Sequence, residues 1–153
     1  MILVGTTLSG KSTWVRNNYP RVEVISRDEI VMELAATRDY SDAFRTVDQK
    51  LVDKVLAQRL IEANLAQSSI IIDMTNLTIK RRARTLSYFG PHFYKVAVVF
   101  PILSNEEYQK RNISRNSTQN KWIPPAVIDS MIDSYQPPTA EEGFDFISVL
   151  NTL

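Results

Sequence analysis

The chain has 153 residues, a length that suits one domain, and its 44% hydrophobic content is that of an ordinary globular protein. It contains no cysteine, which excludes disulfides and thiolate chemistry, and its net charge of +1 indicates no large basic surface, although a local basic groove is compatible with it. No apolar run reaches the ~18 residues of a membrane span, and the first residues do not form a signal peptide. We therefore expect a soluble, cytoplasmic protein with no membrane partner; the composition leaves its oligomeric state open.

Short apolar runs alternate with longer stretches of helical periodicity along the chain. The predicted strands are the mostly β-branched runs Ile2–Val4, Val22–Ile25, Ile70–Ile72, Val96–Phe100 and Phe146–Leu150. Between the second and third run, apolar residues of Asp42–Gln67 recur at spacings of three and four, which predicts a helix. Alternating strands and helices predict an α/β fold, with a parallel sheet covered by helices on both faces.

The first predicted strand runs into a glycine-containing loop. Gly5–Ser12 matches the Walker A pattern G-x-x-x-x-G-K-[ST] at every fixed position. Such a loop turns backbone N–H groups toward phosphate oxygens, and the following helix points its N-terminal dipole at the same anion. The residues expected to bind the nucleotide are Gly5, Thr6, Leu8, Ser9, Gly10, Lys11, Ser12 and Thr13.

This loop predicts a P-loop kinase that uses ATP, or another nucleoside triphosphate, together with Mg²⁺. Lys11 would bridge the β- and γ-phosphates, and the Ser12 hydroxyl would bind the metal.

The second strand is followed by Ser26-Arg27-Asp28-Glu29. A carboxylate at the carboxyl end of a parallel strand lies in the crevice where α/β sheets bind ligands, so Asp28 is a candidate general base for an acceptor hydroxyl. Arg27 is placed beside it as a second candidate contact to the acceptor. The alternative is that Ser26 or Asp28 merely caps the next helix, and the two roles are compatible.

The third strand ends in Asp73-Met74-Thr75-Asn76. Asp73 is the candidate Walker-B-like acid near Mg²⁺, and Thr75 and Asn76 are candidates to position the acceptor. The alternative is a strand end followed by a helix cap at Asn76 or Thr78.

A basic run, Lys80 to Arg84, follows on the next predicted helix. Runs of this kind are usually a solvated helix face, but arginine suits bidentate phosphate contacts, and we expect at least one of the three arginines to reach a phosphate. Arg81 and Arg84 share one face, whereas Arg82 points elsewhere. Arg82 is the one assigned here to substrate.

Arg111 and Arg115 stand four residues apart, hence on one helix face, at the start of Asn112–Pro125, the least apolar stretch of the chain. This stretch is interpreted as a mobile loop flanked by helices. We expect a lid over approximately residues 105–125 whose two arginines cover the triphosphate, the alternative being an ordinary helix surface. Lys121 could contact nucleotide or acceptor, and the adjacent Trp122 is interpreted as packing.

Together these segments resemble the kinase domain of polynucleotide 5′-kinases, both the phage enzyme and the kinase half of animal polynucleotide kinase/phosphatase. The resemblance runs in order along nearly the whole chain. It is carried by Gly5–Thr13 with Trp14, Ser26–Glu29, Asp73–Asn76, Arg82–Arg84, Arg111–Arg115 and the closing segment Pro137–Phe144.

The resemblance implies a three-layer P-loop NTPase fold with a five-stranded sheet in the order 2-3-1-4-5. It also implies that Asp28 is the general base and that Arg111 and Arg115 embrace the triphosphate. Two positions differ from the family: Leu8 stands where glycine or another small residue is usual, and Val31 stands where the phage enzyme has an arginine that holds the acceptor's 3′-phosphate. The resemblance does not extend to the family's phosphatase half, so we expect no end-healing phosphatase activity from these residues.

Three functions compete at this point. The first is phosphorylation of a 5′-hydroxyl of DNA or RNA, which would place the protein in DNA modification or repair, for instance in a phage. The second is phosphorylation of another hydroxyl, on a nucleoside, a small metabolite or a hydroxymethylated base in DNA. The third is a nucleotide-binding module without transferase activity, which is less favoured because such a module has no use for Asp28 as an acceptor base.

Overall fold

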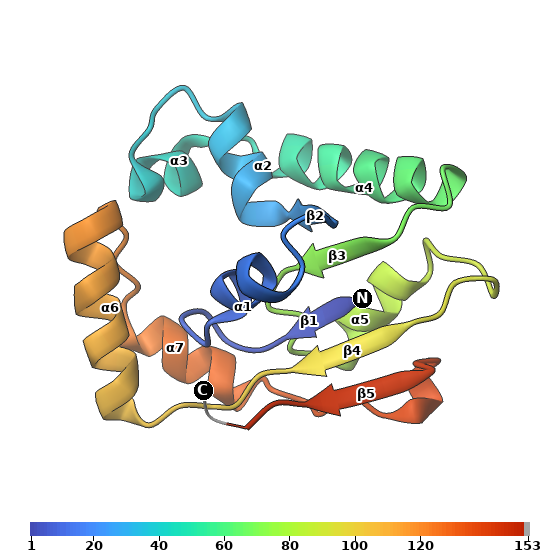
Figure 1. Cartoon of the computed structure of the whole chain (residues 1–153). Helices are drawn as coiled ribbons and strands as arrows, with labels where there is room; N and C mark the ends of the chain where they lie inside the picture. Colours follow the sequence, from blue (N-terminus) through green and yellow to red (C-terminus); the bar gives the residue numbers. More distant parts are fainter. Residues whose placement is uncertain (152–153) are drawn as a thin grey trace.

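The computed structural model describes residues 1–151, which form one sheet flanked by helices (Figure 1). The strands are β1 (Ile2–Val4), β2 (Glu23–Ser26), β3 (Ile70–Asp73), β4 (Val96–Val99) and β5 (Phe146–Val149). The helices are α1 (Lys11–Asn18), α2 (Arg27–Leu34), α3 (Tyr40–Thr46), α4 (Gln49–Leu65), α5 (Ile79–Leu86), α6 (Asn105–Gln119), α7 (Pro125–Asp133) and the 3₁₀ helix η1 (Ala140–Glu142). None of these helices is long and apolar enough to cross a bilayer.

The sheet is parallel throughout, and its strand order β2-β3-β1-β4-β5 confirms the predicted 2-3-1-4-5 arrangement. All five predicted strands are present, with bounds that differ by at most one residue at each end. Because the strands are parallel, their carboxyl ends share one edge, and α2, α3, α6 and α7 gather around it (Figure 1). This is the edge at which open α/β sheets bind ligands.

The sheet is buried on both faces because alternate side chains of each strand point to opposite sides. Ile2 and Val4 face a cluster that includes Leu60 of α4 and Leu86 of α5. Leu3, between them, packs on the other face in a cluster with Val15 of α1. The continuous apolar runs of the sequence therefore mark strands covered by helices on both sides.

The single helix predicted for Asp42–Gln67 is instead two helices, α3 and α4, which was a wrong prediction. Asp48 interrupts it: its carboxylate accepts hydrogen bonds from the backbone N–H groups of Lys50 and Leu51, at 2.9 and 3.4 Å, and so caps α4. An N-cap residue adopts extended backbone geometry, which ends α3 two residues earlier.

The interpretation of Asn112–Pro125 as a mobile loop is also wrong in its bounds. Helix α6 continues to Gln119 and ends at Asn120, whose φ of 49° is left-handed. Only Tyr108 and Asn112 of this helix are buried. The helix therefore lacks the periodic apolar stripe from which helices are predicted in a sequence. The remaining loop is short, and the Asn112 side chain pairs with both backbone groups of Ile123, at 2.7 and 3.1 Å.

Candidate active site

The loop between β1 and α1 has a backbone that only glycine can follow at two places. Gly10 has a φ of 97°, a left-handed conformation that disfavours a side chain. At Gly5 a β-carbon would lie 2.9 Å from Phe100 Cβ and from Ser9 Oγ, closer than atoms can pack. Both fixed glycines of the pattern are thus required by geometry.

Lys11 lies at the centre of this loop with only 8% of its surface exposed. Its ammonium donates to the carbonyl oxygens of Gly5 and Thr6, at 3.0 and 2.5 Å. Burial lowers the pKa of Lys11 to about 8, against the opposing attraction of the Asp73 and Asp28 carboxylates. A phosphate group beside this ammonium would favour its charged form.

The other predicted loop residues divide into those that face the loop's interior and those that do not. Ser9 is 2% exposed, and its hydroxyl lies 3.4 Å from the Lys11 ammonium. The Thr6 hydroxyl pairs with the hydroxyl of Tyr108 in α6 at 2.6 Å, so only the backbone of Thr6 is free to meet a phosphate. Thr13 is exposed on α1 and accepts a hydrogen bond from Arg16 at 3.3 Å.

Leu8 has a φ of 62°, in the left-handed region where the resembling family usually has glycine. A β-carbon in that region costs roughly 1–2 kcal/mol. The side chain recovers stability by packing against a cluster of Leu103, Tyr108 and Ile128, which belongs to α6, α7 and the segment before them. This packing joins the phosphate loop to the helices beside it.

Ser12 and Asp73 meet where α1 begins and β3 ends, and the Ser12 hydroxyl donates to Asp73 Oδ2 at 2.7 Å. Within residues 1–151 no three carboxylates or imidazoles are close enough to hold a metal by themselves. Mg²⁺ in phosphoryl-transfer sites is bound by one or two protein oxygens, waters and the substrate's phosphates. The pair of Ser12 and Asp73 fits that requirement.

Helix α6 places both predicted lid arginines over the phosphate loop. Arg111 donates to the Leu8 carbonyl at 3.1 Å and to Glu107 of its own helix at 2.7 Å. Arg115, one turn further, donates to the Thr7 hydroxyl at 3.4 Å. The spacing of four residues therefore places two guanidinium groups beside the expected position of the triphosphate.

Asp28 lies in the first turn of α2, at the same sheet edge as Asp73, because Ser26 and Asp73 are register partners in β2 and β3. The capping alternative is fulfilled by Ser26, whose hydroxyl accepts from the Glu29 N–H at 3.5 Å. Asp28 is left with a side chain that is 53% exposed. The geometry leaves it available to an acceptor.

Two residues hold one oxygen of the Asp28 carboxylate, and sequence reasoning missed them as its partners. Asp28 Oδ2 accepts hydrogen bonds from the Tyr40 hydroxyl at 3.0 Å and from the Lys121 ammonium at 2.8 Å. Burial alone would raise the pKa of Asp28, but the charge and hydrogen bond of Lys121, helped by Tyr40, hold it below its ordinary value. The carboxylate is therefore ionised at neutral pH, as a general base must be.

The residues after β3 are mainly structural. Asn76 is 2% exposed and donates to the Leu3 carbonyl at 2.9 Å, with a φ of 47° that asparagine tolerates. Thr75 accepts from the Gly5 N–H through its carbonyl at 3.0 Å. Thr78, the other candidate, caps α5. The predicted acceptor contact of the Asn76 side chain is therefore withdrawn: Asn76 ties β3 to the phosphate loop.

Arg82 is fully buried, which corrects its assignment to substrate. Its guanidinium pairs with Glu142 at 2.7 Å and donates to the carbonyl oxygens of Asn76, Leu77 and Gln136. No donor of this group is left for a ligand, because all of them point into the protein. The closing segment Pro137–Phe144, which lacked a chemical explanation, supplies Glu142 to this network.

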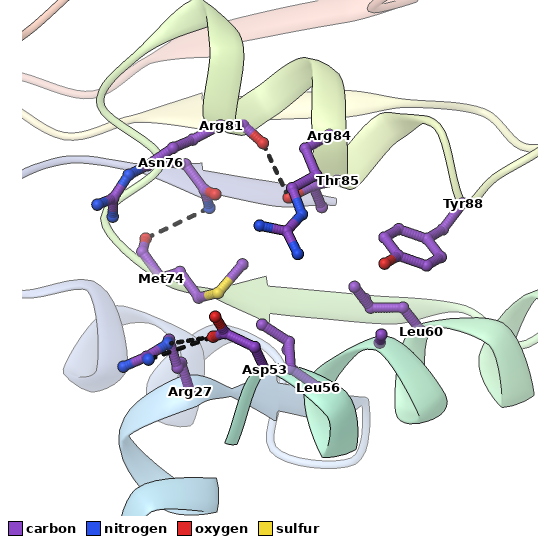
Figure 2. A pocket seen from close by; sticks show the side chains of 11 residues that line it. Arg27, Asp53, Leu56, Leu60, Met74, Asn76, Arg81, Arg84, Thr85 and Tyr88 are labelled. Atoms are coloured by element: carbon purple, nitrogen blue, oxygen red, sulfur yellow. Dashed lines mark hydrogen bonds and ion pairs between the residues drawn. The ribbon is translucent and has the colours of Figure 1, made fainter. Parts of the chain in front are cut away.

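Arg81 and Arg84 behave differently from Arg82, since both are exposed and line a cleft of about 370 Å³ between α5 and α4. Figure 2 shows Arg84 pointing into the cleft, with Arg27 on the opposite wall. Arg27 is held there by Asp53 at 3.2 Å and by Gln49 at 2.7 Å. Three arginines thus line this cleft, and one of them, Arg27, is the chain neighbour of Asp28.

Trp122, interpreted from the sequence as packing, is 44% exposed and lies outside the core clusters of the described residues. Val31 is fully buried in a cluster with Ile30, Ala43 and Val52. No side chain at position 31 could reach an acceptor phosphate without leaving this core. Any such contact has to come from another residue.

Residues 1–138 match the family model AAA_33, described as an AAA domain. No curated protein sequence matches the chain. Among solved structures, the Pnkp1/Rnl/Hen1 RNA repair complex contains a chain with a TM-score of 0.68 and 24% identity, over 95% of this chain and 45% of that one. The chain thus spans less than half the length of that protein.

Two further solved structures are similar over nearly the whole chain. Kti12 from Chaetomium thermophilum, solved with ADP-AlF3, has a TM-score of 0.64 and 12% identity over 97% of this chain and 87% of its own. A gluconokinase from Sinorhizobium meliloti has a TM-score of 0.56 and 11% identity over 99% and 81%. At these identities the similarity concerns the fold, which is that of P-loop kinases.

Proposed function

The chain belongs to the AAA_33 family. We propose that it is an ATP-dependent kinase that phosphorylates a hydroxyl group of a nucleic acid, specifically the 5′-hydroxyl of DNA or RNA. The observation that carries the proposal is the position of Asp28. It is an ionised, half-exposed carboxylate at the same sheet edge as the phosphate-loop lysine and the two arginines of α6. A nucleotide switch has no use for an acceptor base there.

The proposed reaction is an in-line transfer. Lys11 and the loop amides hold the β- and γ-phosphates, and Arg111 and Arg115 offset negative charge on the transferred group. Ser12 and Asp73 would hold Mg²⁺, which would supply positive charge to the phosphates. The acceptor oxygen bonds to the γ-phosphorus as its proton passes to Asp28, and the bond to the β,γ-bridging oxygen breaks to release ADP.

The cleft of Figure 2 supports a nucleic acid as acceptor. A polynucleotide offers a row of phosphates beyond its terminal hydroxyl, and three arginines line this cleft: Arg81, Arg84 and Arg27, which is adjacent to Asp28 in the chain. Tyr88 and Met74 give the same cleft apolar surface of the kind on which bases pack. The likeness to a chain of an RNA repair complex points in the same direction.

The competing acceptor is a small hydroxyl compound, which the likeness to a gluconokinase favours. A transfer assay with γ-labelled ATP and Mg²⁺ separates the candidates. It offers 5′-hydroxyl DNA and RNA oligonucleotides, free nucleosides, gluconate and DNA with hydroxymethylated bases side by side, with an Asp28→Asn variant as the control.

Label on the oligonucleotide that a 5′-phosphatase removes is the expected result. Label on a nucleoside, gluconate or modified base alone would keep the kinase and overturn the acceptor. ATP binding without label on any acceptor would overturn the transferase proposal and favour the binding module.

A further inference from the structure

Lys121 lies between α6 and α7 with a side chain that is only 7% exposed. A buried ammonium group requires partners to offset its lost hydration. Two are present on different helices: Asp28 Oδ2 of α2, at 2.8 Å, and the ring of Tyr40 in α3, whose centroid lies 3.4 Å away. Neither is a local contact, since Asp28 is 93 residues away along the chain.

The two oxygens of Asp28 are in different positions. Oδ2 accepts from both Lys121 and Tyr40, whereas Oδ1 has no hydrogen-bond partner among residues 1–151. Two donors on one oxygen fix the rotation of the carboxylate. They leave the second oxygen as the one that an acceptor hydroxyl can approach.

The chain on either side of Lys121 is fastened independently of Asp28. The Asn112 side chain holds both backbone groups of Ile123, and Asn120 donates to Asp39 at 2.5 Å. Lys121 is therefore carried by a firm support that continues directly from α6, the helix that bears Arg111 and Arg115.

We propose that Lys121 is a positioning residue for phosphoryl transfer: together with Tyr40 it orients the Asp28 carboxylate, so that the free oxygen of Asp28 meets the acceptor hydroxyl. The inference rests on the proposed function, because it concerns the same carboxylate. It also couples the two substrates, since one segment of the chain brings the arginines to the donor and the lysine to the acceptor's base.

The surrounding charges determine what removal of Lys121 does. Besides Asp28 and Tyr40, the groups that act on Lys121 are Arg115 of α6, which lowers its pKa, and Asp73 of β3, which raises it; burial has the largest effect and brings the pKa to about 8. Burial raises the pKa of Asp28, and without the ammonium the carboxylate would lose the charge and hydrogen bond that oppose burial most, so its pKa would rise above that in wild type. A raised pKa protonates the base as the pH falls, so an acid limb appears in the rate profile.

The experiment compares kcat against pH for wild type, Lys121→Met and Lys121→Arg, with the oligonucleotide as acceptor and ATP saturating. Lys110→Met is the matched control, because it removes an exposed lysine of α6 that does not contact Asp28 or the segment around Lys121. A carboxyl-carbon NMR titration of Asp28 in wild type and Lys121→Met reads the same pKa without any substrate.

We expect Lys121→Met to lose about 10-fold in kcat at neutral pH, part of the roughly 10²–10⁴-fold that a general base contributes. Its profile should gain an acid limb that Lys121→Arg and Lys110→Met lack, at an unchanged KM for ATP, and the Asp28 resonance should titrate at higher pH. Equal acid limbs and equal Asp28 titrations in wild type and Lys121→Met would overturn the inference. If the wild type transfers no phosphate but the pKa of Asp28 is still higher in Lys121→Met than in wild type, the proposed function is refuted. The positioning of Asp28 by Lys121 would then still stand.

Discussion

Arg82 of α5 and Arg115 of α6 are two arginines that were both assigned to ligand binding from the sequence. The structure places them in opposite environments. Arg82 is fully buried and its donors are all used by Glu142 and backbone carbonyls. Arg115 makes one contact of 3.4 Å to the phosphate loop, so most of its donors remain open to a ligand. An arginine whose hydrogen-bond donors are all satisfied within the protein therefore has a structural role. An arginine with open donors remains available to a ligand.

Of the substitutions that test this comparison, Arg115→Ala should have the largest effect, a loss of kcat. An arginine that stabilises the transferring phosphoryl group contributes roughly 10³–10⁵-fold to kcat, so we expect a loss of about 10³-fold with little change in the unfolding temperature. Steady-state kinetics and a thermal melt of the same sample measure both. Lys110→Ala, an exposed cation on the same helix, is the control, and an equal loss there would show that only general charge matters.

Arg82→Met should do the reverse and act on stability. It leaves the Glu142 carboxylate buried without its partner, which typically destabilises a protein by about 3–5 kcal/mol. Urea unfolding measures this, and Arg84→Met, two residues along the same helix, should stay within about 0.5 kcal/mol of wild type because Arg84 is exposed. An Arg82→Met protein as stable as wild type but inactive would reverse the assignment.

The same network predicts a pH dependence of stability. Burial raises the pKa of Glu142, but hydrogen bonds from Arg82 and the Thr139 N–H outweigh it and hold the pKa below its ordinary value. A lowered folded-state pKa stabilises the protein above the unfolded-state pKa, and this stability is lost as the pH falls through the folded value. Thermal melts in acidic buffers should show this loss for wild type and a smaller one for Glu142→Gln; parallel curves would contradict it.

Arg84→Gln should have the smallest effect, confined to the acceptor. Removing one phosphate contact should raise the KM for the oligonucleotide several-fold and reduce the salt dependence of binding by about one unit of slope. The KM for ATP should not change, because Arg84 lines the cleft and does not contact the phosphate loop. A change in the ATP constant alone would place Arg84 on the donor side.

Features set by local pattern could be predicted from the sequence. The strands follow from β-branched runs, and the phosphate loop follows from the fixed residues of one eight-residue pattern, Gly5–Ser12. The pair of Arg111 and Arg115 follows from helical spacing together with the need of a P-loop kinase for arginines at the phosphates. In each case the residues that determine the geometry are neighbours in sequence.

Features that depend on distant partners could not be predicted. Arg82 is structural because Glu142, 60 residues later, is brought beside it, and Lys121 matters because α6 and α7 carry it across to Asp28. Neither contact leaves a periodic signal in the chain. The break at Asp48 was visible as a capping residue, but the apolar periodicity continuing across it concealed the boundary.

The most direct test of the central claim, that Asp28 is the acceptor base of a kinase, is the transfer rate of Asp28→Asn together with its affinity for ATP. The substitution keeps the shape and removes the proton acceptor. We predict that transfer from γ-labelled ATP falls by roughly 10²-fold or more while the dissociation constant for ATP stays within about twofold of wild type. An Asp28→Asn protein that transfers phosphate at the wild-type rate would contradict the account.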